Sequence, residues 1–439
     1  MKKLSFQKIF CFISFLFILS CCIFYGTRFI KLYLENKEEQ KIEKNSLVKV
    51  IRKNNENKDN FKEINGSEYF INDSDNNYLI YSNILWRIIK INDDNSLTVI
   101  SEEALTSLAY GVNLTYENSY INKWLNNTDD EYSGILESNL NEVKTYLQKT
   151  NTCLDIVNEV DNKDCENVLK DNYISLLSTT DYANIGNKKS YVNNNEYFYL
   201  NNTNNENEVW YITDDGKLST SKGTDIIGVK PVITIKSNID YIKGDGTKDD
   251  PYTIEKEIGL FGSYVKLDNQ LWRIYQVNET EVRLVLNDYL KVNNANLEYR
   301  YSNTNSYHND TKYGSIAYYL NHDFLNKLSY KDKIKEVKWS NGYYGSESNY
   351  DYQSALDKTI DSKVALISIG DIIINNDLEN YATLTGTSNK GSMIYTIRNN
   401  KKVYTKSVVS ENYVVPTISI DTNLLIKGTG TYDSPLEME

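Results

Sequence analysis

The segment Ile84-Leu-Trp-Arg-Ile-Ile89 recurs as Gln270-Leu-Trp-Arg-Ile-Tyr275, at an offset of 186 residues (84 to 270). Branched apolar and aromatic residues in so short a run are typical of a buried strand. Five further segments recur in the same order, with offsets between 184 (242 to 426) and 195 (123 to 318) residues. They are Lys123–Asn126 and Tyr318–Asn321, Ile174–Ser178 and Val364–Ser368, Trp210–Thr213 and Tyr395–Arg398, Val229–Ile235 and Val414–Ile420, and Ile242–Pro251 and Ile426–Pro435.

The prolines follow the same repeat. The chain has four, and they form two matched pairs, Pro231 with Pro416 and Pro251 with Pro435. Segments repeated at a nearly constant spacing indicate that one structural unit occurs more than once. A chain of 439 residues has room for two domains of ordinary size. We therefore predict two tandem homologous domains, over residues 61–255 and 259–439.

Each predicted domain is rich in strands. After the Trp-Arg-Ile strand, a second strand is expected at Leu97–Ser101 in the first copy and at Glu281–Leu286 in the second. A short helix follows around Tyr120–Leu125 and its match Ile316–Leu325, then a long variable loop region, and finally strands that include Val232–Ile235. Because strands predominate and helices are interspersed among them, we predict the α+β class.

The N-terminal region has the pattern of a signal anchor. Residues 9–26 form a run of eighteen without a charge, about 27 Å long as a helix and close to the thickness of a bilayer core. Lysines at positions 2, 3 and 8 favour a cytoplasmic tail over residues 1–8. We therefore predict a single-pass protein of the cell membrane with its domains outside the cell. Residues 27–60, which are rich in Lys, Glu and Asn, are expected to form a polar, solvated spacer.

Two other kinds of leader remain open. Ile18–Cys21 loosely resembles a bacterial lipobox, in which Cys21 would be lipidated after cleavage. A cleaved secretory signal normally has a small-x-small site after its apolar run, and none follows here. The length of the uncharged run favours a membrane anchor over both of these leaders.

Cysteine usage points to an oxidising compartment. Outside the apolar leader the chain has only Cys153 and Cys165, twelve positions apart, and we predict a disulfide between them. Two unpaired thiols in a polar loop are the alternative. A zinc site is not expected, because the only histidines, His308 and His322, belong to the other copy and two thiols do not complete a tetrahedral shell. No cofactor is predicted.

The charge balance excludes some partners. Lys and Arg number 48 against 60 Asp and Glu, which gives a net charge of −12. Binding to nucleic acid or to an anionic membrane surface needs clustered positive charge. We therefore expect no nucleic-acid partner, and contact with the membrane only through the N-terminal helix.

The ordered motifs resemble a known family. Trp-Arg-Ile, a strand ending in Ile-Ser, an aromatic-Leu-Asn helix, Leu-Leu-Ser…Asp, Trp-Tyr-Ile and Gly-Val-Lys-Pro-Val-Ile are similar to an uncharacterised domain of anchored or secreted proteins from low-GC Gram-positive bacteria. The order also distantly resembles the fold of formylglycine-generating enzymes and C-type lectins, a likeness that implies no activity. Lys230 and Val415 stand where the family commonly has Arg. A polar site built on those arginines is therefore not expected in the first copy.

Tyrosines in the variable loops of the second copy are the candidate binding residues. Tyrosine supplies rigid amphipathic contact area at low entropy cost, and loops often carry function. We predict a surface for a glycan, a peptide or a cell-envelope ligand, with ordinary solvated loops as the alternative. The candidates are Tyr299, Tyr301, Tyr307, Tyr343, Tyr344, Tyr350 and Tyr352.

The sequence favours binding over catalysis. Our leading hypothesis is a membrane-anchored extracellular protein with two tandem binding or adhesion domains, and no catalytic residue is assigned. The alternatives are a structural surface spacer and a cell-envelope enzyme that uses carboxylates. Asp181 and Asp371 are the only acidic pair retained near the centre of both copies. The same pair would also fit the cap of a helix or turn.

Overall fold

The computed structural model describes most of the two predicted domains. The described residues are 26–28, 31, 46–56, 59–71, 76–126, 135–158, 165–185, 191–257, 259–304, 306–307, 314–340, 359–375, 378–387, 392–398 and 401–438. The predicted signal anchor at 9–26 lies outside these ranges except for Gly26. Within them, no helix combines the length and apolar character needed to cross a membrane. The fold is strand-rich and mixed α+β, as predicted. We refer to residues 46–257 as unit 1 and residues 259–438 as unit 2.

Unit 1 contains an eight-stranded sheet. Its strands are β1 (Phe61–Ile64), β2 (Ser67–Phe70), β3 (Tyr78–Tyr81), β4 (Ile84–Ile91), β5 (Leu97–Ser101), β9 (Ile174–Ser175), β14 (Val232–Ile235) and β15 (Tyr252–Thr253). The long strand β4 pairs with β5 on one side and with β3 and then β2 on the other. The last strand, β15, pairs in parallel with β3, so the end of the unit lies beside its beginning.

Unit 2 repeats this order of pairing in a seven-stranded sheet. Its strands are β16 (Tyr264–Leu267), β17 (Gln270–Val277), β18 (Glu281–Leu286), β24 (Val364–Leu366), β29 (Pro416–Asp421), β30 (Leu425–Lys427) and β31 (Leu436–Met438). The path β16-β17-β18-β29-β24 corresponds to β3-β4-β5-β14-β9, and β31 pairs in parallel with β16 as β15 does with β3. Even the break in register recurs, after Ile88 in β4 and after Ile274 in β17.

A smaller five-stranded sheet accompanies each large one. In unit 1 it runs β12-β11-β10-β13-β6, and in unit 2 it runs β27-β26-β25-β28-β21. One pair in each is parallel, β10 with β13 and β25 with β28. The bounds are β6 Thr106–Ala109, β10 Phe198–Asn205, β11 Glu208–Ile212, β12 Leu218–Ser221, β13 Ile226–Val229, β21 Glu298–Arg300, β25 Tyr381–Gly386, β26 Met393–Ile397, β27 Val403–Ser407 and β28 Glu411–Tyr413.

Hairpins and short helices complete the units. The hairpins are β7 (Thr150–Cys153) with β8 (Val168–Asn172), β19 (Lys291–Val292) with β20 (Ala295–Asn296), and β22 (Val337–Ser340) with β23 (Thr359–Ser362). The helices are α2 (Leu47–Asn55), η1 (Tyr116–Asn118), α3 (Tyr120–Asn126), α4 (Ile135–Asn139), α5 (Val143–Tyr146), α6 (Thr179–Asn184), α7 (Ile316–Tyr319), η2 (Leu320–Phe324), η3 (Leu325–Lys327) and η5 (Thr422–Leu424).

Matched turns close the two units. Gly244 and Gly428 have φ angles of +98° and +89°, which favour glycine over residues with a side chain. A Cβ at these positions would collide with the carbonyl oxygens of Pro251 and Pro435, respectively. The Gly-x-Gly-Thr…Pro endings therefore form the same tight turn in each unit, and this turn leads into the last strand, which lies beside β3 in unit 1 and beside β16 in unit 2.

Helix α2 (Leu47–Asn55) corrects one sequence-based prediction, because its residues were assigned to the solvated spacer. Leu47, Val48 and Ile51 are 3% exposed or less. Their spacing places them on one face of the helix, which packs on unit 1. The Leu47 backbone amide donates to the carbonyl of Ile239, 3.3 Å away, and the Arg52 guanidinium forms an ion pair with Glu68. Unit 1 therefore begins before residue 61.

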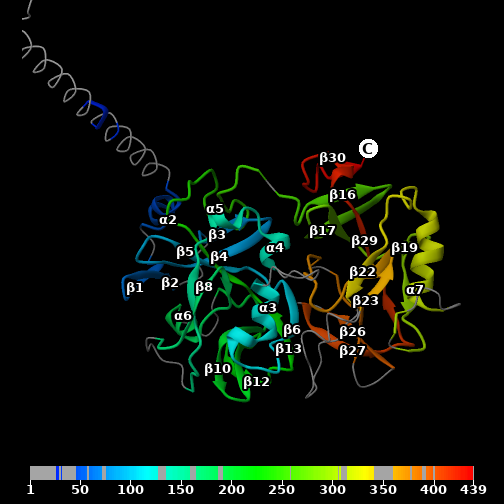
Figure 1. The fold of residues 1–439 in the computed structure, drawn as a ribbon, viewed down its shortest axis with the longest axis horizontal. Coiled ribbons are helices and arrows are strands. Elements are labelled where there is room, and N and C mark those ends of the chain that lie inside the picture. Colours follow the sequence, from blue (N-terminus) through cyan, green and yellow to red (C-terminus); the bar gives the residue numbers. More distant parts are fainter. Residues whose placement is uncertain are drawn as a thin grey trace, which may run out of the picture.

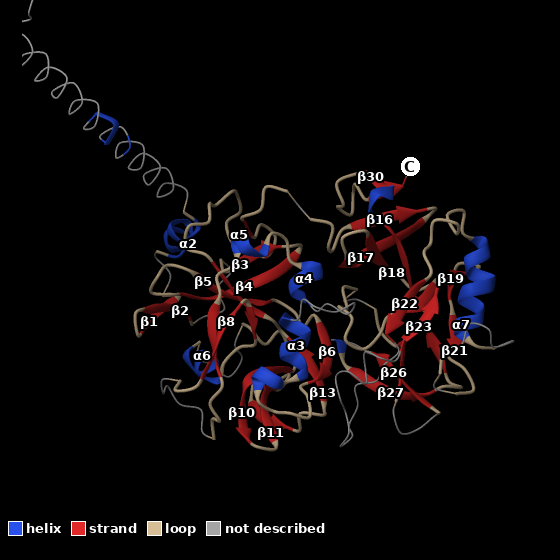
Figure 2. Cartoon of the chain, viewed as in Figure 1, coloured by secondary structure: helices blue, strands red, loops and turns tan. Residues whose placement is uncertain are grey.

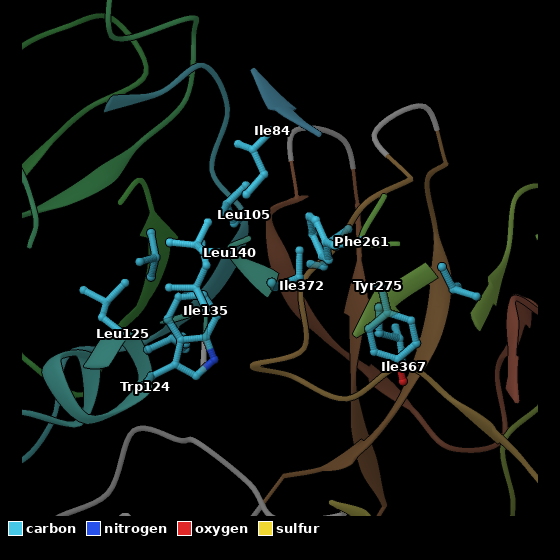
Figure 3. Close-up of a cluster of buried hydrophobic side chains, with 14 of the residues drawn as sticks. Ile84, Leu105, Trp124, Leu125, Ile135, Leu140, Phe261, Tyr275, Ile367 and Ile372 are labelled. Atoms are coloured by element: carbon cyan, nitrogen blue, oxygen red, sulfur yellow. The ribbon is translucent and has the colours of Figure 1, made fainter. Parts of the chain in front are cut away.

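The two units lie side by side (Figures 1 and 2); in Figure 1 unit 1 runs from blue to green and unit 2 from green to red. The indole nitrogen of Trp124 in unit 1 donates to the carbonyl of Gly370 in unit 2 at 2.8 Å. Apolar side chains continue across the boundary, where Leu105 approaches Phe261 and Ile372 (Figure 3). Burying the Trp124 indole and these apolar side chains fixes the orientation of the units.

Candidate ligand-binding groove

A groove of about 350 Å³ opens on the large sheet of unit 1. Its lining comes from β4, the β4–β5 turn, β5, β7, β14 and the segment that enters α6. Most of the lining side chains carry neutral amides or hydroxyls, and these include Asn92, Thr98, Gln148, Thr152, Asn201 and Thr234. The groove is therefore a polar surface over the sheet.

The floor of the groove is defined by the pairing of three strands. Lys90 of β4 is paired with Thr98 of β5, and Thr98 is paired with Thr234 of β14. Side chains of directly paired residues project from the same face of a sheet. Consequently, three polar side chains form a row across adjacent strands. This row could not be read from β4, β5 or β14 alone, because it arises only from their register.

One end of the groove is formed by a partly buried ion pair. The Lys90 ammonium lies 2.7 Å from Asp181 Oδ1, and the Tyr69 hydroxyl donates to the same oxygen at 2.7 Å. Burial acts to raise the pKa of Asp181, but the Lys90 charge and hydrogen bonds from Lys90, Tyr69 and Ser178 outweigh it. The pKa of Asp181 therefore lies below its ordinary value, and the carboxyl is ionised at neutral pH.

The predicted disulfide forms part of another wall. Cys153 and Cys165 are bonded, with their Cα atoms 5.8 Å apart, which confirms the pairing expected from the sequence. Cys153 ends β7 and lines the groove, and its carbonyl accepts a hydrogen bond from the Asn201 side chain at 3.3 Å. Among the described residues one cluster has metal-ligand types, Cys153, Asp155 and Cys165, but both its sulfurs are in the disulfide. The crosslink thus holds a wall of the groove and offers no thiolate to a metal.

In unit 2 the equivalent positions carry larger side chains. Arg283 is paired with Ser419 as Thr98 is paired with Thr234, and Trp339 has the place in β22 that Thr152 has in β7. The Arg283 guanidinium lies 4.8 Å from the centre of the Trp339 ring. Trp339 is only 1% exposed. Two small hydroxyl side chains in unit 1 are therefore replaced by a packed Arg–Trp pair in unit 2.

The two acids retained in both copies have different environments. Asp371, the match of Asp181, is 8% exposed and accepts a hydrogen bond from the Ser368 backbone amide at 2.8 Å. Burial raises the pKa of Asp371 to about 6, against the opposing effects of the Ser368 hydrogen bond and the Arg283 charge. The acid of unit 2 thus supports a turn, as in the capping alternative, whereas the acid of unit 1 borders the open groove.

Two of the predicted tyrosine contacts are core residues, which corrects the expectation of an exposed surface. Tyr301 is 1% exposed and Tyr307 is 3% exposed. Their hydroxyls donate to the carbonyls of Leu384 (2.7 Å) and Val364 (3.0 Å), so the polar end of each ring is satisfied inside the protein. Tyr299 is half-buried, with its ring 5.2 Å from that of Tyr319. The remaining candidates lie outside the described residues, namely Tyr343, Tyr344, Tyr350 and Tyr352.

The repeat itself contained the signal for this burial. Tyr110 and Tyr116 of unit 1 have the same six-residue spacing as Tyr301 and Tyr307. In the structure Tyr110 donates to the carbonyl of Asn201, and Tyr116 to the carbonyl of Ile174, 3.4 Å away. Tyrosines retained at matched positions in both units are thus part of the framework.

A second polar centre of unit 1 was not identified from the sequence. The Lys230 side chain is fully buried and donates to the carbonyls of Glu102 (2.7 Å) and Val192 (2.6 Å). Its ammonium also lies 3.6 Å from Glu196, and burial lowers its pKa. Nearby, the Arg87 guanidinium lies 3.6 Å from Glu102 and 3.9 Å from the centre of the Tyr78 ring. Lys230 is therefore a structural cation in the interior of unit 1.

Comparison of the chain with family models, with curated proteins and with solved structures gives no match.

Proposed function

We propose that the chain is a membrane-anchored extracellular binding protein whose unit 1 binds a neutral, hydroxyl-rich ligand, a glycan, in the groove over β4, β5 and β14. The observation that carries the proposal is the composition of the groove: a row of side-chain amides and hydroxyls held by strand register. Amides and hydroxyls both donate and accept hydrogen bonds, as sugar hydroxyls do. The volume of about 350 Å³ falls in the usual range for small-ligand sites.

Charge in the groove favours a neutral ligand. Asp181 is paired with Lys90 at 2.7 Å. Asp94 accepts hydrogen bonds from the Ser96 backbone amide and the Gln148 side chain, both at 2.8 Å. Since Lys90, Asp94 and Asp181 already have partners, a ligand charge that paired with any of them would have to displace an existing interaction. The amides and hydroxyls of the groove also bond to protein groups, but they can exchange these bonds for bonds to a neutral ligand without leaving a charge unpaired.

The same acids argue against the carboxylate enzyme. A general acid in glycoside hydrolysis needs a raised pKa so that it carries a proton at neutral pH. The pKa of Asp181 is lowered, and burial at Asp94 is outweighed by hydrogen bonds from Gln148 and Ser96 that lower its pKa as well. These two carboxylates of the groove suit binding better than proton transfer.

The location and the domain organisation are part of the proposal. The uncharged run at residues 9–26 supports a membrane anchor, and the disulfide supports an oxidising compartment outside the cytoplasm. The matching strand orders support a duplication of one domain, of the uncharacterised family that the motifs resemble. Unit 1 has an open polar groove, whereas the matched positions of unit 2 hold the packed Arg283–Trp339 pair.

The test uses the full chain and a glycan array, followed by calorimetric titration with the glycans retained. In the variant Thr152→Trp the groove receives the side chain that unit 2 has at the matched position. In the control Thr405→Trp the same change is made on the exposed strand β27. We expect Thr152→Trp to weaken glycan binding at least tenfold and Thr405→Trp to leave it unchanged.

The proposal is overturned if no glycan binds, or if Thr152→Trp folds normally and binds glycan as the parent does. Folding of each variant is checked by far-ultraviolet circular dichroism and by its urea midpoint. A charged peptide that binds in place of glycans would assign the groove to another ligand class and would also refute the proposal.

A further inference from the structure

A cavity of about 210 Å³ lies between the two units, separate from the groove. Ile84 and Leu105 contribute to its wall from unit 1, and Phe261 and Ile372 contribute from unit 2 (Figure 3). One arginine, Arg273 of β17, also lines the cavity. A cation beside apolar walls is costly unless an opposite charge accompanies it.

Comparison of the units shows which charge Arg273 lacks. Arg273 is paired across the strands with Tyr264 and stacks on its ring at 4.5 Å, as Arg87 stacks on Tyr78 at 3.9 Å. Arg87 has a carboxylate beside it, that of Glu102, at 3.6 Å. The tyrosine–arginine pair is therefore common to both units, and in unit 1 it is completed by an acid.

The acid is missing from unit 2. The backbone amide of Glu102 donates to the carbonyl of Leu85 at 2.8 Å, and that of Asn287 donates to the carbonyl of Leu271 at 2.9 Å. These bonds identify Asn287 as the match of Glu102, so a neutral amide stands where unit 1 has a carboxylate. No carboxylate of the described residues forms an ion pair with Arg273, which instead donates from Nε and Nη2 to the carbonyl of Gly262, at 3.2 and 2.9 Å.

The other charges around the cavity have partners. Glu102 is beside Arg87 at 3.6 Å, and Glu103 lies 3.4 Å from the ammonium of Lys401. Lys401 also donates to the carbonyl of Ala104. Burial lowers the pKa of Arg273, partly opposed by Tyr264, and an anion beside the guanidinium would relieve this cost. Arg273 is thus the charged side chain of the cavity that has no opposite charge beside it among the described residues.

We propose that the cavity between the units binds a small organic anion, a carboxylate on an apolar body, with the carboxylate on Arg273 and the body against Phe261, Leu105 and Ile372. The ligand carboxylate takes the place that Glu102 has beside Arg87. Because the walls come from both units, the bound anion contacts both and stabilises their association, and the unfolding temperature rises with its concentration.

The test measures binding to the full chain with hexanoate as the probe, by calorimetric titration and by thermal unfolding. Hexylamine, which has the same body and the opposite charge, and inorganic phosphate are the comparison probes. Two variants act independently on the anion site: Arg273→Gln removes the cation, and Asn287→Glu supplies the carboxylate that unit 1 has. The control is Arg398→Gln, an exposed arginine stacked on Tyr404 at 4.3 Å that does not line the cavity.

We expect hexanoate to bind the parent and to raise its unfolding temperature, whereas hexylamine has no effect. Both site variants should lose at least tenfold in affinity, with Arg398→Gln unchanged. Asn287→Glu keeps the proposal falsifiable if Arg273→Gln does not fold. Failure of hexanoate to bind, or equal binding to Asn287→Glu, overturns it. Phosphate binding as tight as that of hexanoate also overturns it, because the site would then recognise charge alone.

Discussion

Replacing Asp371 with Asn should stabilise the protein, although Asp371 is buried and hydrogen-bonded. The carboxyl of Asp371 is 8% exposed and has its pKa raised from 3.8 to about 6, mainly by burial. Between these values the folded state holds a proton that the unfolded state has released. The neutral acid therefore contributes stability below about pH 4, and this contribution is lost as the pH rises through about 6.

The magnitude follows from the shift. About two pKa units at about 1.4 kcal/mol each give about 3 kcal/mol, the cost at neutral and higher pH of ionising this acid in the folded state. An asparagine oxygen can still accept the bond that the Ser368 amide donates at 2.8 Å, and it carries no charge. Asp371→Asn should therefore exceed the parent in stability by about 2–3 kcal/mol near pH 8, and by much less near pH 4.

Urea unfolding of the full chain at a series of pH values measures this difference. The expected result is an unfolding midpoint that falls between about pH 4 and 6 in the parent and falls less in Asp371→Asn. Our account of this site is refuted if Asp371→Asn is less stable than the parent near pH 8, or if the difference between them does not depend on pH.

Two further predictions concern unit 1. Asp181→Asn should lower the stability that Asp371→Asn raises, because it removes the partner of the partly buried Lys90 ammonium. We expect the free energy of unfolding in urea near pH 7 to fall by about 1–3 kcal/mol. The difference in stability between parent and variant should vanish as the pH falls below about 4. The pKa of Asp181 is lowered in the folded protein, so protonation of Asp181 at low pH removes its stabilising contribution from the parent as well. The double variant Cys153→Ser with Cys165→Ser should lower stability by up to about 3 kcal/mol and weaken glycan binding in the same preparation. Unchanged stability and affinity under reducing conditions would contradict this role of the disulfide.

The strands around the repeated Trp-Arg-Ile segments were predictable because their local pattern and their tertiary role agree. Trp86 and Trp272 are both fully buried in the long central strands β4 and β17. Their apolar neighbours are typical of strands, and the copies reinforce each other. The disulfide was predictable for a similar reason, since only Cys153 and Cys165 lie outside the leader.

Other features depend on contacts that no local pattern reveals. Helix α2 is surrounded by charged residues, so the small apolar face of Leu47, Val48 and Ile51 was overlooked. The burial of Tyr301 depends on a backbone carbonyl 83 residues away in the chain. The groove results from strand register and from the small size of Thr152, whose match in unit 2 is Trp339. The difference in side-chain size between matched positions of the two copies is therefore the sequence signal for the groove.

The parallel pairing of the last strand of each unit, β15 with β3 and β31 with β16, has a mechanical consequence. In β3 with β15, Leu79 is paired with Tyr252, and in β16 with β31, Val265 is paired with Leu436. Tension applied to the chain on the two sides of such a pair pulls its strands lengthwise past each other. The bonds joining them then carry the load together and break together, whereas an antiparallel pair pulled from one end opens one bond after another. A chain folded in this way resists stretching best where the pull reaches these parallel pairs.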